Sequence, residues 1–496
     1  MSKSYILAID QGTSSTKTII FDADGQVVAK ANEALHTSYL EGAQVEQDPE
    51  DIYQNVLTSV KKCLQAFEDK GLSRKEIACC GISNQRETFV VWDKDGRPLY
   101  NAVVWQCKRS IDVCKELKER GLEEEIKSKT GLLIDPYFSG SKLIWLNKHV
   151  PNVQAAIASG EAMFGTIDSW LLFKLTAGAQ YRTDYTNASR TLFFNLAELS
   201  WDRELLEAFG LNTIRLPELK PSASNFGAST FDGLFDDPLP ITAMIGDSHA
   251  ATFGEGCFDP GTAKATLGTG CSVMMNIGDK PTSSQSGMVT TVCWSTAERI
   301  DYAMEGVIVS CGSVVEWFRN QLGLFAESTE TEKMATSVED NNGVYIVPAF
   351  SGLGAPYWDM SRKASIEGLT FDCNRNHLVR AALETVAYQI MDIVTVMETE
   401  TGIPMEKLML NGGMTSNKFV LNFLASLLNT NLLVGTMPDV SALGAAYLAG
   451  LSGGVYQSID ELKELHARKS TTQADKSIAD VQKFYQEWKT FMEVKV

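Results

Sequence analysis

Short apolar runs alternate with glycine-centred turns over residues 5–31. The runs are rich in β-branched residues, which predicts three strands joined by two tight turns. An apolar residue then recurs every fourth position from Ile52 to Leu64, as on the buried face of a helix over about 49–67. Asp48 is the expected N-cap of this helix and Pro49 its first residue.

Two further apolar runs, at 77–83 and 88–93, predict strands. The opening pattern returns later: the apolar run 239–246 ends at Asp247, and residues 262–278 predict strands around a Gly-Thr-Gly turn. Strands interleaved with helices predict an α/β architecture. The repetition predicts a duplicated fold whose two halves face each other across a cleft.

The chain has 496 residues, too many for one hydrophobic core, so two domains are expected. The stretch 253–260 is rich in Gly and places the boundary between domains 1–254 and 255–496. A long helix over roughly 377–400 belongs to the second domain. The last 40 residues predict a charged, helical, solvent-exposed cover.

Charge and cysteine usage narrow the possible partners and compartment. The net charge of −18 argues against nucleic-acid or anionic-membrane partners, which need a basic patch. Ten scattered cysteines without a CxxC pair favour reduced thiols in the cytoplasm. The N-terminus lacks a signal-peptide pattern, and the longest apolar run, 442–451, is about half of the ~20 residues that a membrane span needs.

The segment "DQGTSSTK", 10–17, carries the first candidate chemistry. Its glycine permits a tight turn, and the hydroxyls, amides and lysine that follow can surround phosphate oxygens. Asp10 can hold a magnesium ion through water. An ordinary hairpin turn stabilised by its own Asp side chain is the alternative interpretation.

Two more glycine turns lie in the second half. "LGTGCS", 267–272, repeats the first motif, and a pair of phosphate-binding turns is what ATP bound between two lobes needs. "NGGMTSNKF", 411–419, opens a helix and could pass along an adenine or ribose face, with Asn417 as a hydrogen-bonding residue. A plain helix start is equally compatible with this pattern.

Arg86, Glu87 and Trp105 form a candidate polyol site. A guanidinium beside a carboxylate can donate to and accept from neighbouring hydroxyls, and an indole face can cover the carbon skeleton. By spacing alone, a surface ion pair and a core tryptophan fit the same residues.

Together these motifs resemble the FGGY family of carbohydrate kinases, most closely its glycerol kinases. The resemblance runs from about residue 5 to residue 470. It includes "DQGTSSTK", "GISNQRET", "YNAVVWQCKR", "TDYTNASRTLFFN", "NGVYIVPAFSGLGAPYWD", "NGGMTSN" and "ALGAAYLAGL". The two family signature segments correspond to "YFSGSKLIWLNKH" and "IEGLTFDCNRNHLVRAALE".

The resemblance implies an actin-like ATPase fold of two ribonuclease-H-like domains around an ATP cleft, and phosphorylation of a polyol or sugar with ATP and Mg²⁺. Asp10 would lie near the metal ion, and Asp247 would be the general base. The ATP site would consist of Thr13, Ser14, Ser15, Lys17, Thr269, Gly312, Glu316, Gly413 and Asn417. The polyol site would consist of Arg86, Glu87, Trp105, Tyr137 and Asp247.

Four positions depart from the pattern of glycerol kinases. Lys17 stands where an Arg is frequent, and Glu316 where Gln is often found. Ser248 replaces the Gln that follows the catalytic Asp, and Ser272 replaces a Phe near the second turn. The acceptor pocket is therefore expected to be roomier and more polar, with Ser248 and Ser272 as specificity positions.

The expected acceptor is glycerol or a closely related small polyol. A tetritol, pentitol, pentulose or dihydroxyacetone remains the alternative, and neighbouring side chains could also refill the pocket. His249 is expected behind the site, orienting Asp247 or reaching a distal hydroxyl. Actin-like folds also build filaments and chaperones, but such a protein would not need the polyol residues. We also expect a homo-oligomer, a dimer or tetramer.

Overall fold

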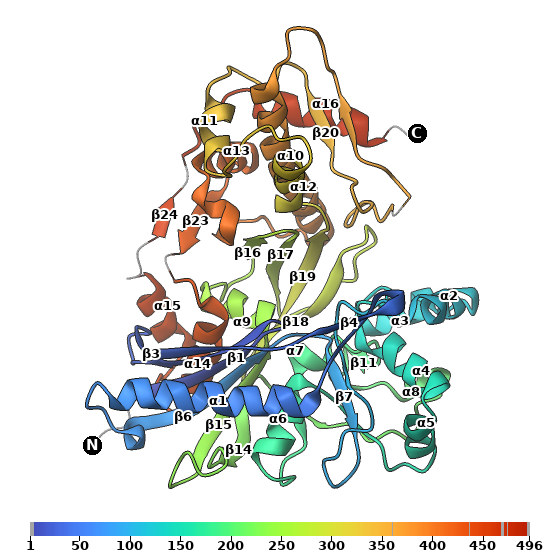
Figure 1. Cartoon of the computed structure of the whole chain (residues 1–496), viewed down its shortest axis with the longest axis vertical. Helices are drawn as coiled ribbons and strands as arrows, with labels where there is room; N and C mark the ends of the chain where they lie inside the picture. Colours follow the sequence, from blue (N-terminus) through green and yellow to red (C-terminus); the bar gives the residue numbers. More distant parts are fainter. Residues whose placement is uncertain (1–3, 360, 436, 468–470, 474, 494–496) are drawn as a thin grey trace.

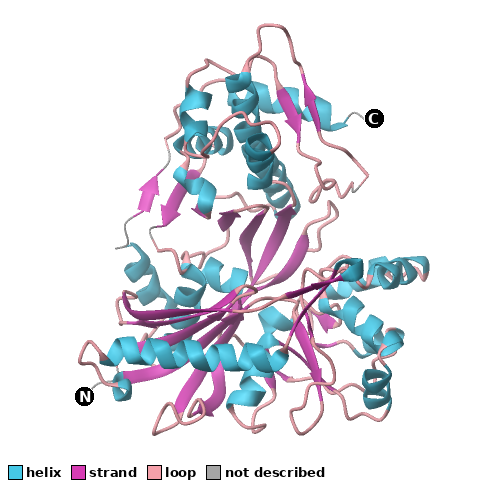
Figure 2. Ribbon diagram, in the orientation of Figure 1, coloured by secondary structure: helices cyan, strands magenta, loops and turns pink. Residues whose placement is uncertain are grey.

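The computed structural model describes residues 4–359, 361–435, 437–467, 471–473 and 475–493 (Figures 1 and 2). The first half of the chain, blue to green in Figure 1, forms the lower body of the molecule around a six-stranded sheet. In spatial order the strands of this sheet are β14 (Ala223–Ser229), β15 (Leu239–Gly246), β6 (Ile77–Asn84), β1 (Tyr5–Gln11), β2 (Ser15–Phe21) and β3 (Val27–Ala34).

A seven-stranded sheet forms the base of the upper body. Its strands, in spatial order, are β18 (Val289–Ser295), β19 (Ile300–Ile308), β17 (Cys271–Gly278), β16 (Thr262–Leu267), β22 (Lys407–Asn411), β23 (Asn431–Gly435) and β24 (Thr471–Gln473).

The two large sheets share one topology. In the first, β1 and β2 form an antiparallel hairpin, while β6 and β15 extend the sheet in parallel with β1. In the second, β16 and β17 form the hairpin, while β22 and β23 extend the sheet in parallel with β16. The expected pair of ribonuclease-H-like units is therefore present.

Smaller sheets and the helices complete the two bodies. A five-stranded sheet contains β4 (Ser38–Leu40), β5 (Gln44–Gln47), β8 (Ala102–Val103), β7 (Phe89–Trp92) and β9 (Met163–Thr166). The two-stranded sheets are β10 (Arg182–Asp184) with β13 (Glu218–Lys220), β11 (Phe194–Asn195) with β12 (Ser200–Trp201), and β20 (Tyr345–Val347) with β21 (Ser365–Glu367). The helices before β16 are α1 (Pro49–Glu68), α2 (Ile111–Glu119), α3 (Glu123–Thr130), α4 (Ser139–His149), α5 (Pro151–Ala158), α6 (Ile167–Leu175), α7 (Tyr185–Ala188), α8 (Arg203–Ala208) and α9 (Asp247–Gly254).

The helices after β16 are α10 (Gly312–Asn320), α11 (Glu330–Thr336), α12 (Arg375–Thr401), α13 (Lys418–Leu428), α14 (Val440–Ser452), α15 (Ile459–Ala467) and α16 (Val481–Glu493). Short 3₁₀ turns lie at Glu41–Ala43, Arg74–Glu76 and Gly413–Ser416. In Figure 1, α10 to α13 and α16 lie above the second sheet.

One helix of the second half packs on the first sheet. Helix α14 lies against β1, β6, β15 and α9, and both α14 and α15 sit in the lower body in Figure 1. The contact is close because small residues face it: a Cβ on Gly81 or Gly444 would lie 2.2 Å from Ala445 O or 1.8 Å from Ala250 O, respectively. The chain thus returns to the first sheet after completing most of the second.

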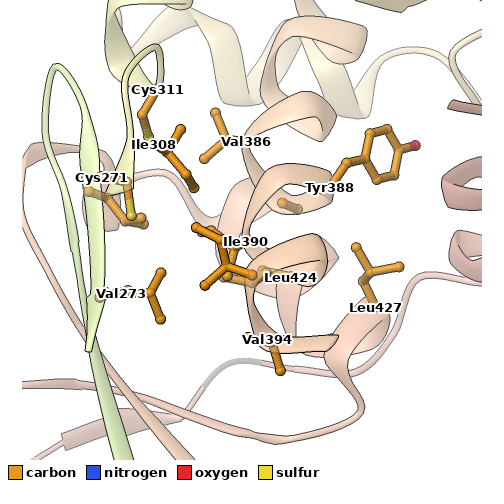
Figure 3. Close-up of a cluster of buried hydrophobic side chains, with 14 of the residues drawn as sticks. Cys271, Val273, Ile308, Cys311, Val386, Tyr388, Ile390, Val394, Leu424 and Leu427 are labelled. Atoms are coloured by element: carbon orange, nitrogen blue, oxygen red, sulfur yellow. The ribbon is translucent and has the colours of Figure 1, made fainter. Parts of the chain in front are cut away.

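The hydrophobic core of the upper body lies between its sheet and α12. Figure 3 shows Cys271, Val273 and Ile308 of the sheet side facing Val386, Ile390 and Val394 of the helix. These side chains are buried, with exposures of 0–3 %. Burial of this apolar surface stabilises the sheet whose opposite face turns toward the lower body.

Most local predictions are confirmed. The predicted helix over 49–67 is α1, where the Asp48 side chain accepts a hydrogen bond from Glu50 N, and the one over 377–400 is α12. The predicted cover at the C-terminus differs in two ways. It includes a strand, β24, and its last helix buries one face, with Trp488 fully buried in the upper core. Amphipathic spacing, more than charge, decides the position of α16.

Candidate functional site

Two aspartates lie at neighbouring strand ends of the first sheet. Asp10 is the penultimate residue of β1, and Asp247 follows β15 as the first residue of α9. Because β1, β6 and β15 are parallel, their carboxyl ends meet at the same edge of the sheet. Both aspartates line a cavity of about 680 Å³, together with Lys17, Ser248 and residues of the second half.

The pKa of Asp10 is raised to about 6, first by burial and second by repulsion from the Asp247 carboxylate. The hydroxyl of Ser83 donates to Asp10 Oδ1 at 2.9 Å and works against this shift. A carboxyl group with a raised pKa at a cavity wall favours a bound cation, which would relieve the repulsion.

The predicted Arg86–Glu87 pair is part of a buried ionic network. Arg86 donates to both carboxylate oxygens of Glu305 at 3.1 and 3.2 Å, and its Nε lies 3.3 Å from Asp247 Oδ1. Arg190 lies 2.5 Å from Glu87 and 2.9 Å from Glu305. The four residues other than Asp247 are at most 6 % exposed. Their charges are therefore stabilised by one another and not by water. The surface ion pair that spacing also allowed is excluded.

Glu305 is the centre of this network. Burial opposes its ionisation, but Arg86 and Arg190 outweigh this and hold the pKa of the carboxyl well below its usual range. Glu87 has a φ of +59°, an unusual backbone conformation for this residue type. Its carbonyl accepts a hydrogen bond from Ser139 Oγ at 2.8 Å. The surrounding contacts therefore over-determine the position of Glu87.

Trp105 and Tyr137 form an aromatic wall beside this network. Their rings are 5.6 Å apart in an edge-to-face arrangement, and the Lys142 ammonium donates to the carbonyls of both residues. Trp105 Nε1 donates to Thr13 Oγ1 at 2.9 Å. Thr13 Oγ1 donates in turn to Gln85 Oε1 at 3.2 Å. The turn of the first hairpin is thereby joined directly to the predicted polyol wall.

The lysine of the first hairpin is held by the second half of the chain. Lys17 Nζ lies 2.9 Å from Asp439 Oδ1, and Asp439 directly precedes the first residue of α14. The Lys17 side chain is 40 % exposed. Lys30 of β3 reaches the same carboxylate at 3.7 Å. Lys17 lines the cavity of Asp10 and Asp247, as its predicted position beside phosphates requires.

A second cavity, of about 860 Å³, gathers the predicted residues of the second half. Thr269 comes from the β16–β17 turn, and the others come from α10 and from the segment before α13: Gly312, Glu316, Gly413 and Asn417. Glu316 forms a 2.6 Å ion pair with Arg319, and Asn417 Nδ2 donates to Thr331 Oγ1 at 3.0 Å.

The two cavities adjoin along two backbone segments. Thr266 and Gly412 line the first cavity, while their chain neighbours Leu267 and Gly413 line the second. A molecule extending from one cavity into the other would pass between these two segments. Such a site fits an elongated ligand whose charged end lies in the first cavity, which Lys17 lines.

Of the four departing positions, Ser248 and Ser272 were expected in the acceptor pocket beside Asp247. Ser248 lines the first cavity, and Ser272 Oγ donates to Glu305 Oε1 at 2.9 Å. His249 is fully buried and lies 3.3 Å from Thr291 Oγ1. Burial, with Arg86 and Arg190, keeps the pKa of His249 well below its ordinary value, so the imidazole is neutral. Among the described residues it forms no hydrogen bond to Asp247.

Three contributors to the site were not assigned from the sequence: Glu305, Arg190 and Lys142. Arg190 lies in "TDYTNASRTLFFN" and Lys142 in "YFSGSKLIWLNKH", two of the segments that carry the resemblance. Their position in these segments marked Arg190 and Lys142 as candidate residues, but it did not indicate what either side chain contacts. Glu305 lies in β19 without such a signal, and only its contact with an arginine 219 residues away reveals it.

Comparisons with known proteins agree with this geometry. A model of the N-terminal domain of the FGGY family of carbohydrate kinases matches residues 5–254, and a model of its C-terminal domain matches residues 263–453. A glycerol kinase of Carboxydothermus hydrogenoformans is 45% identical over 93% of this chain and 92% of that protein. Glycerol kinase 2 of Thermotoga maritima is 43% identical over 98% and 97% of the two chains.

A solved structure covers the whole chain as well. The crystal structure of Plasmodium falciparum glycerol kinase with ADP matches with a TM-score of 0.94 and 36% identity, over 100% of this chain and 99% of that one. Both domains, their order and their arrangement are therefore shared with that enzyme. This chain belongs to the FGGY family of carbohydrate kinases.

Proposed function

We propose that this protein transfers the γ-phosphoryl group of ATP to a primary hydroxyl of glycerol, giving the polyol phosphate and ADP. One observation carries the proposal: the Asp247 carboxylate, 3.3 Å from the Arg86 guanidinium, lines a cavity that adjoins the pocket of Thr269 and Asn417. The relatives named glycerol kinase support the choice of acceptor.

Asp247 is the general base of this proposal. Phosphoryl transfer has a loose transition state, so positioning and charge neutralisation supply most of the rate. Asp247 would accept the proton of the attacking hydroxyl late in the transfer. Arg86, which is held by Glu305, would orient the Asp247 carboxylate and the acceptor hydroxyl. Glu87, Trp105 and Tyr137 would bind the remaining hydroxyls and cover the carbon skeleton.

The ATP phosphates would lie between the two hairpins. Lys17 and the turn residues Thr13, Ser14 and Ser15 would contact them from the first sheet, and Thr269 from the second. Gly312, Glu316, Gly413 and Asn417 would bind the nucleoside part in the second cavity. Closure of the two bodies would exclude water, which otherwise competes as acceptor.

Asp10 fits a magnesium ion that is bound mainly through water and substrate. Among the described residues, no group of three or more His, Cys, Asp or Glu side chains could hold a metal ion by itself. A single carboxylate with the phosphates of its substrate is a usual setting for Mg²⁺. Burial and the nearby Asp247 carboxylate raise the pKa of Asp10, and this supports the proposal because a bound cation would stabilise the ionised carboxylate. When bound, Mg²⁺ neutralises charge on the phosphates.

The two domains would divide the work, residues 1–254 binding the acceptor and phosphates and residues 255–496 the nucleotide. The contacts make this division incomplete, because Glu305 and Ser272 of the second part reach the acceptor site. Movement between the two bodies would therefore open and close both sites together.

Among the described residues no cysteine forms a disulfide bond, which is compatible with a reducing compartment such as the cytoplasm. No described helix is long and apolar enough to cross a membrane. A homo-oligomer, dimer or tetramer, remains a prediction that light scattering of the purified protein would test.

A coupled assay of ATP consumption tests the proposal. It compares glycerol with dihydroxyacetone, tetritols, pentitols and pentuloses, and glycerol should have the highest kcat/KM. A longer acceptor with a higher kcat/KM would identify this protein as a kinase of that compound. ATP turnover that is equally fast without any acceptor would contradict a polyol kinase and favour a nucleotide-driven assembly protein.

The longer acceptors are the second candidate, favoured by the small side chains of Ser248 and Ser272. The double variant Ser248→Gln/Ser272→Phe would fill the pocket and raise the ratio of kcat/KM for glycerol over the longer compound by at least about tenfold. Ser272→Ala is the matched control, because it removes the hydrogen bond to Glu305 without filling space. If wild type already prefers glycerol and the double variant merely loses activity, the roomier-pocket hypothesis is wrong.

A further inference from the structure

A buried lysine faces the cavity of Asp10 and Asp247 from the second sheet. Lys264 lies in the middle of β16 and is 1% exposed. Its strand neighbours Ala263 and Ala265 point into the upper core, so strand alternation turns Lys264 to the opposite face, toward the lower body. Lys264 is one of the residues that line the cavity.

Most of the hydrogen-bonding capacity of Lys264 is unused. An ammonium has three donors, and Lys264 Nζ donates to Thr266 Oγ1 at 3.1 Å. Among the described residues it has no ion pair and no other hydrogen-bond partner. Other buried arginines and lysines each have a carboxylate or carbonyl partner: Arg86, Arg109, Lys142, Arg190, Arg362 and Arg380.

The fold itself does not require a lysine at this position. The two hairpins align through their shared Gly-Thr turns, Gly12-Thr13 with Gly268-Thr269, and Lys264 then corresponds to Ala8. Ala8 is fully buried in the equivalent strand. A buried cation without an anionic partner is costly, so its presence in only one of two equivalent strands indicates a ligand.

The surroundings indicate which ligand. Burial lowers the pKa of Lys264, and Arg86 lowers it further, whereas Glu305 and Asp247 oppose the change. An anion in the cavity would favour the charged ammonium in the same way. Lys264 shares its cavity with Asp247 and Lys17, and it precedes by a few residues the turn that lines the nucleotide cavity. A phosphoryl group that passes from the nucleotide to the acceptor would travel from the Gly-Thr-Gly turn toward Asp247, and therefore past Lys264.

We propose that Lys264 is a further catalytic residue, whose ammonium binds the phosphoryl group during transfer from the side of the second sheet. This inference rests on the proposed kinase function. Lys264 would neutralise charge on the oxygens of the transferred group while Asp247 accepts the proton of the acceptor hydroxyl. The bond between the γ-phosphorus of ATP and its bridging oxygen breaks, ADP leaves with that oxygen, and the phosphorus bonds to the acceptor oxygen, whose proton passes to Asp247. Lys264 itself remains protonated.

The test replaces Lys264 with methionine, which keeps the length of the side chain and removes its charge. We expect Lys264→Met to lower kcat about 10²–10³-fold, as the loss of one pre-positioned transition-state donor does, with the KM for the polyol changed less than threefold. Lys407→Met, in the neighbouring strand β22, is the matched control and should keep wild-type turnover. Lys264→Arg should recover part of the lost kcat.

Nucleotide binding supplies a readout that does not depend on turnover. Lys264→Met should weaken the binding of an imido-bridged, non-hydrolysable ATP analogue at least about tenfold while changing ADP affinity less than threefold. The proposal is overturned if analogue binding and kcat are unchanged. It is also overturned if ADP, analogue and polyol binding fall together, which would indicate a structural lysine. A wild type without polyol-dependent turnover would contradict the kinase function, while the analogue-to-ADP ratio would still test Lys264.

Discussion

The two hairpins β1–β2 and β16–β17 have the same topology but different chemistry. At aligned positions, Asp10 corresponds to Thr266 and Lys17 to Val273, so the first hairpin carries charge where the second is neutral. The first turn is tied to the polyol wall through Thr13 and Trp105, whereas Thr269 lines the separate nucleotide cavity. Duplication therefore supplies two turns of the same geometry, and the different residues at matched positions would divide the phosphate-binding roles that we propose for them.

The largest expected effect concerns Asp247, which follows a parallel strand of the first sheet. Asp247→Asn keeps the shape of the side chain but removes the base, so kcat should fall about 10²–10⁴-fold while nucleotide binding persists. Steady-state kinetics at saturating substrates measures this. Asp259→Asn, an exposed aspartate paired with Lys463, should leave kcat unchanged. A variant at 247 that keeps more than a tenth of wild-type turnover would rule out its role as base.

Removing the charge of the first hairpin should affect ATP more than the acceptor. Lys17→Ala should raise the KM for ATP about tenfold, because a charge directed at phosphate oxygens is lost, with the polyol KM changed less than twofold. Lys30→Ala is the matched control, because Lys30 also faces Asp439 but is 62% exposed. Equal effects of both variants would show that Lys17 acts only through Asp439.

Matched threonines can separate the two turns from each other. Thr13→Val removes the acceptor of the Trp105 hydrogen bond and should raise the KM values for both ATP and polyol about threefold to tenfold. Thr269→Val should raise the KM for ATP alone. If Thr269→Val changed the polyol KM as strongly as Thr13→Val, the two turns would not have divided their roles.

The smallest expected effect is a pH dependence of Mg²⁺ binding that arises from Asp10 of the first hairpin. The pKa of Asp10 is raised to about 6, so the carboxyl gains a proton as the pH falls through that value. Mg²⁺ affinity should therefore decrease about fourfold from pH 7.5 to pH 5.5. Titration of Mg²⁺ in the presence of ADP measures it, and Asp10→Asn should remove the dependence. A wild-type affinity that is constant over this range would contradict the metal site.

The same shift has a defined sign for stability without metal. Asp10 binds its proton more tightly in the folded state than in the unfolded state. In the metal-free protein, the contribution of Asp10 to the free energy of unfolding should therefore be fully present below the ordinary pKa of an aspartate and be lost as the pH rises through about 6. Thermal unfolding of the metal-free wild type and of Asp10→Asn, measured from pH 4 to pH 7.5, tests this. The stability of the wild type relative to Asp10→Asn should decrease as the pH rises.

Local pattern was sufficient for individual elements and for residues at strand ends. The apolar period of α1 and its cap at Asp48 define a helix whose contacts lie within a few turns of the chain. Asp10 and Asp247 could be expected at the site because the motifs that contain them match the family. Only the structure shows that both follow parallel strands of the same first sheet, and that the strand before Asp247 does not belong to the second sheet. The extra strand β24 and the buried face of α16 were missed, because each depends on a partner elsewhere in the fold.

The sequence by itself determined the family, the duplicated α/β units and several residues of the two cavities, because these lie in short motifs that occur along the chain in the order typical of the family. Only the tertiary structure decided how the charges are paired. Arg86 pairs with Glu305, 219 residues later in the sequence, and Lys17 pairs with Asp439, which directly precedes the helix α14 that packs on the first sheet. Lys264 lines the same cavity as Asp247 and has no ion pair among the described residues. The pairing of buried charges depends on distances between elements, which local sequence patterns do not encode.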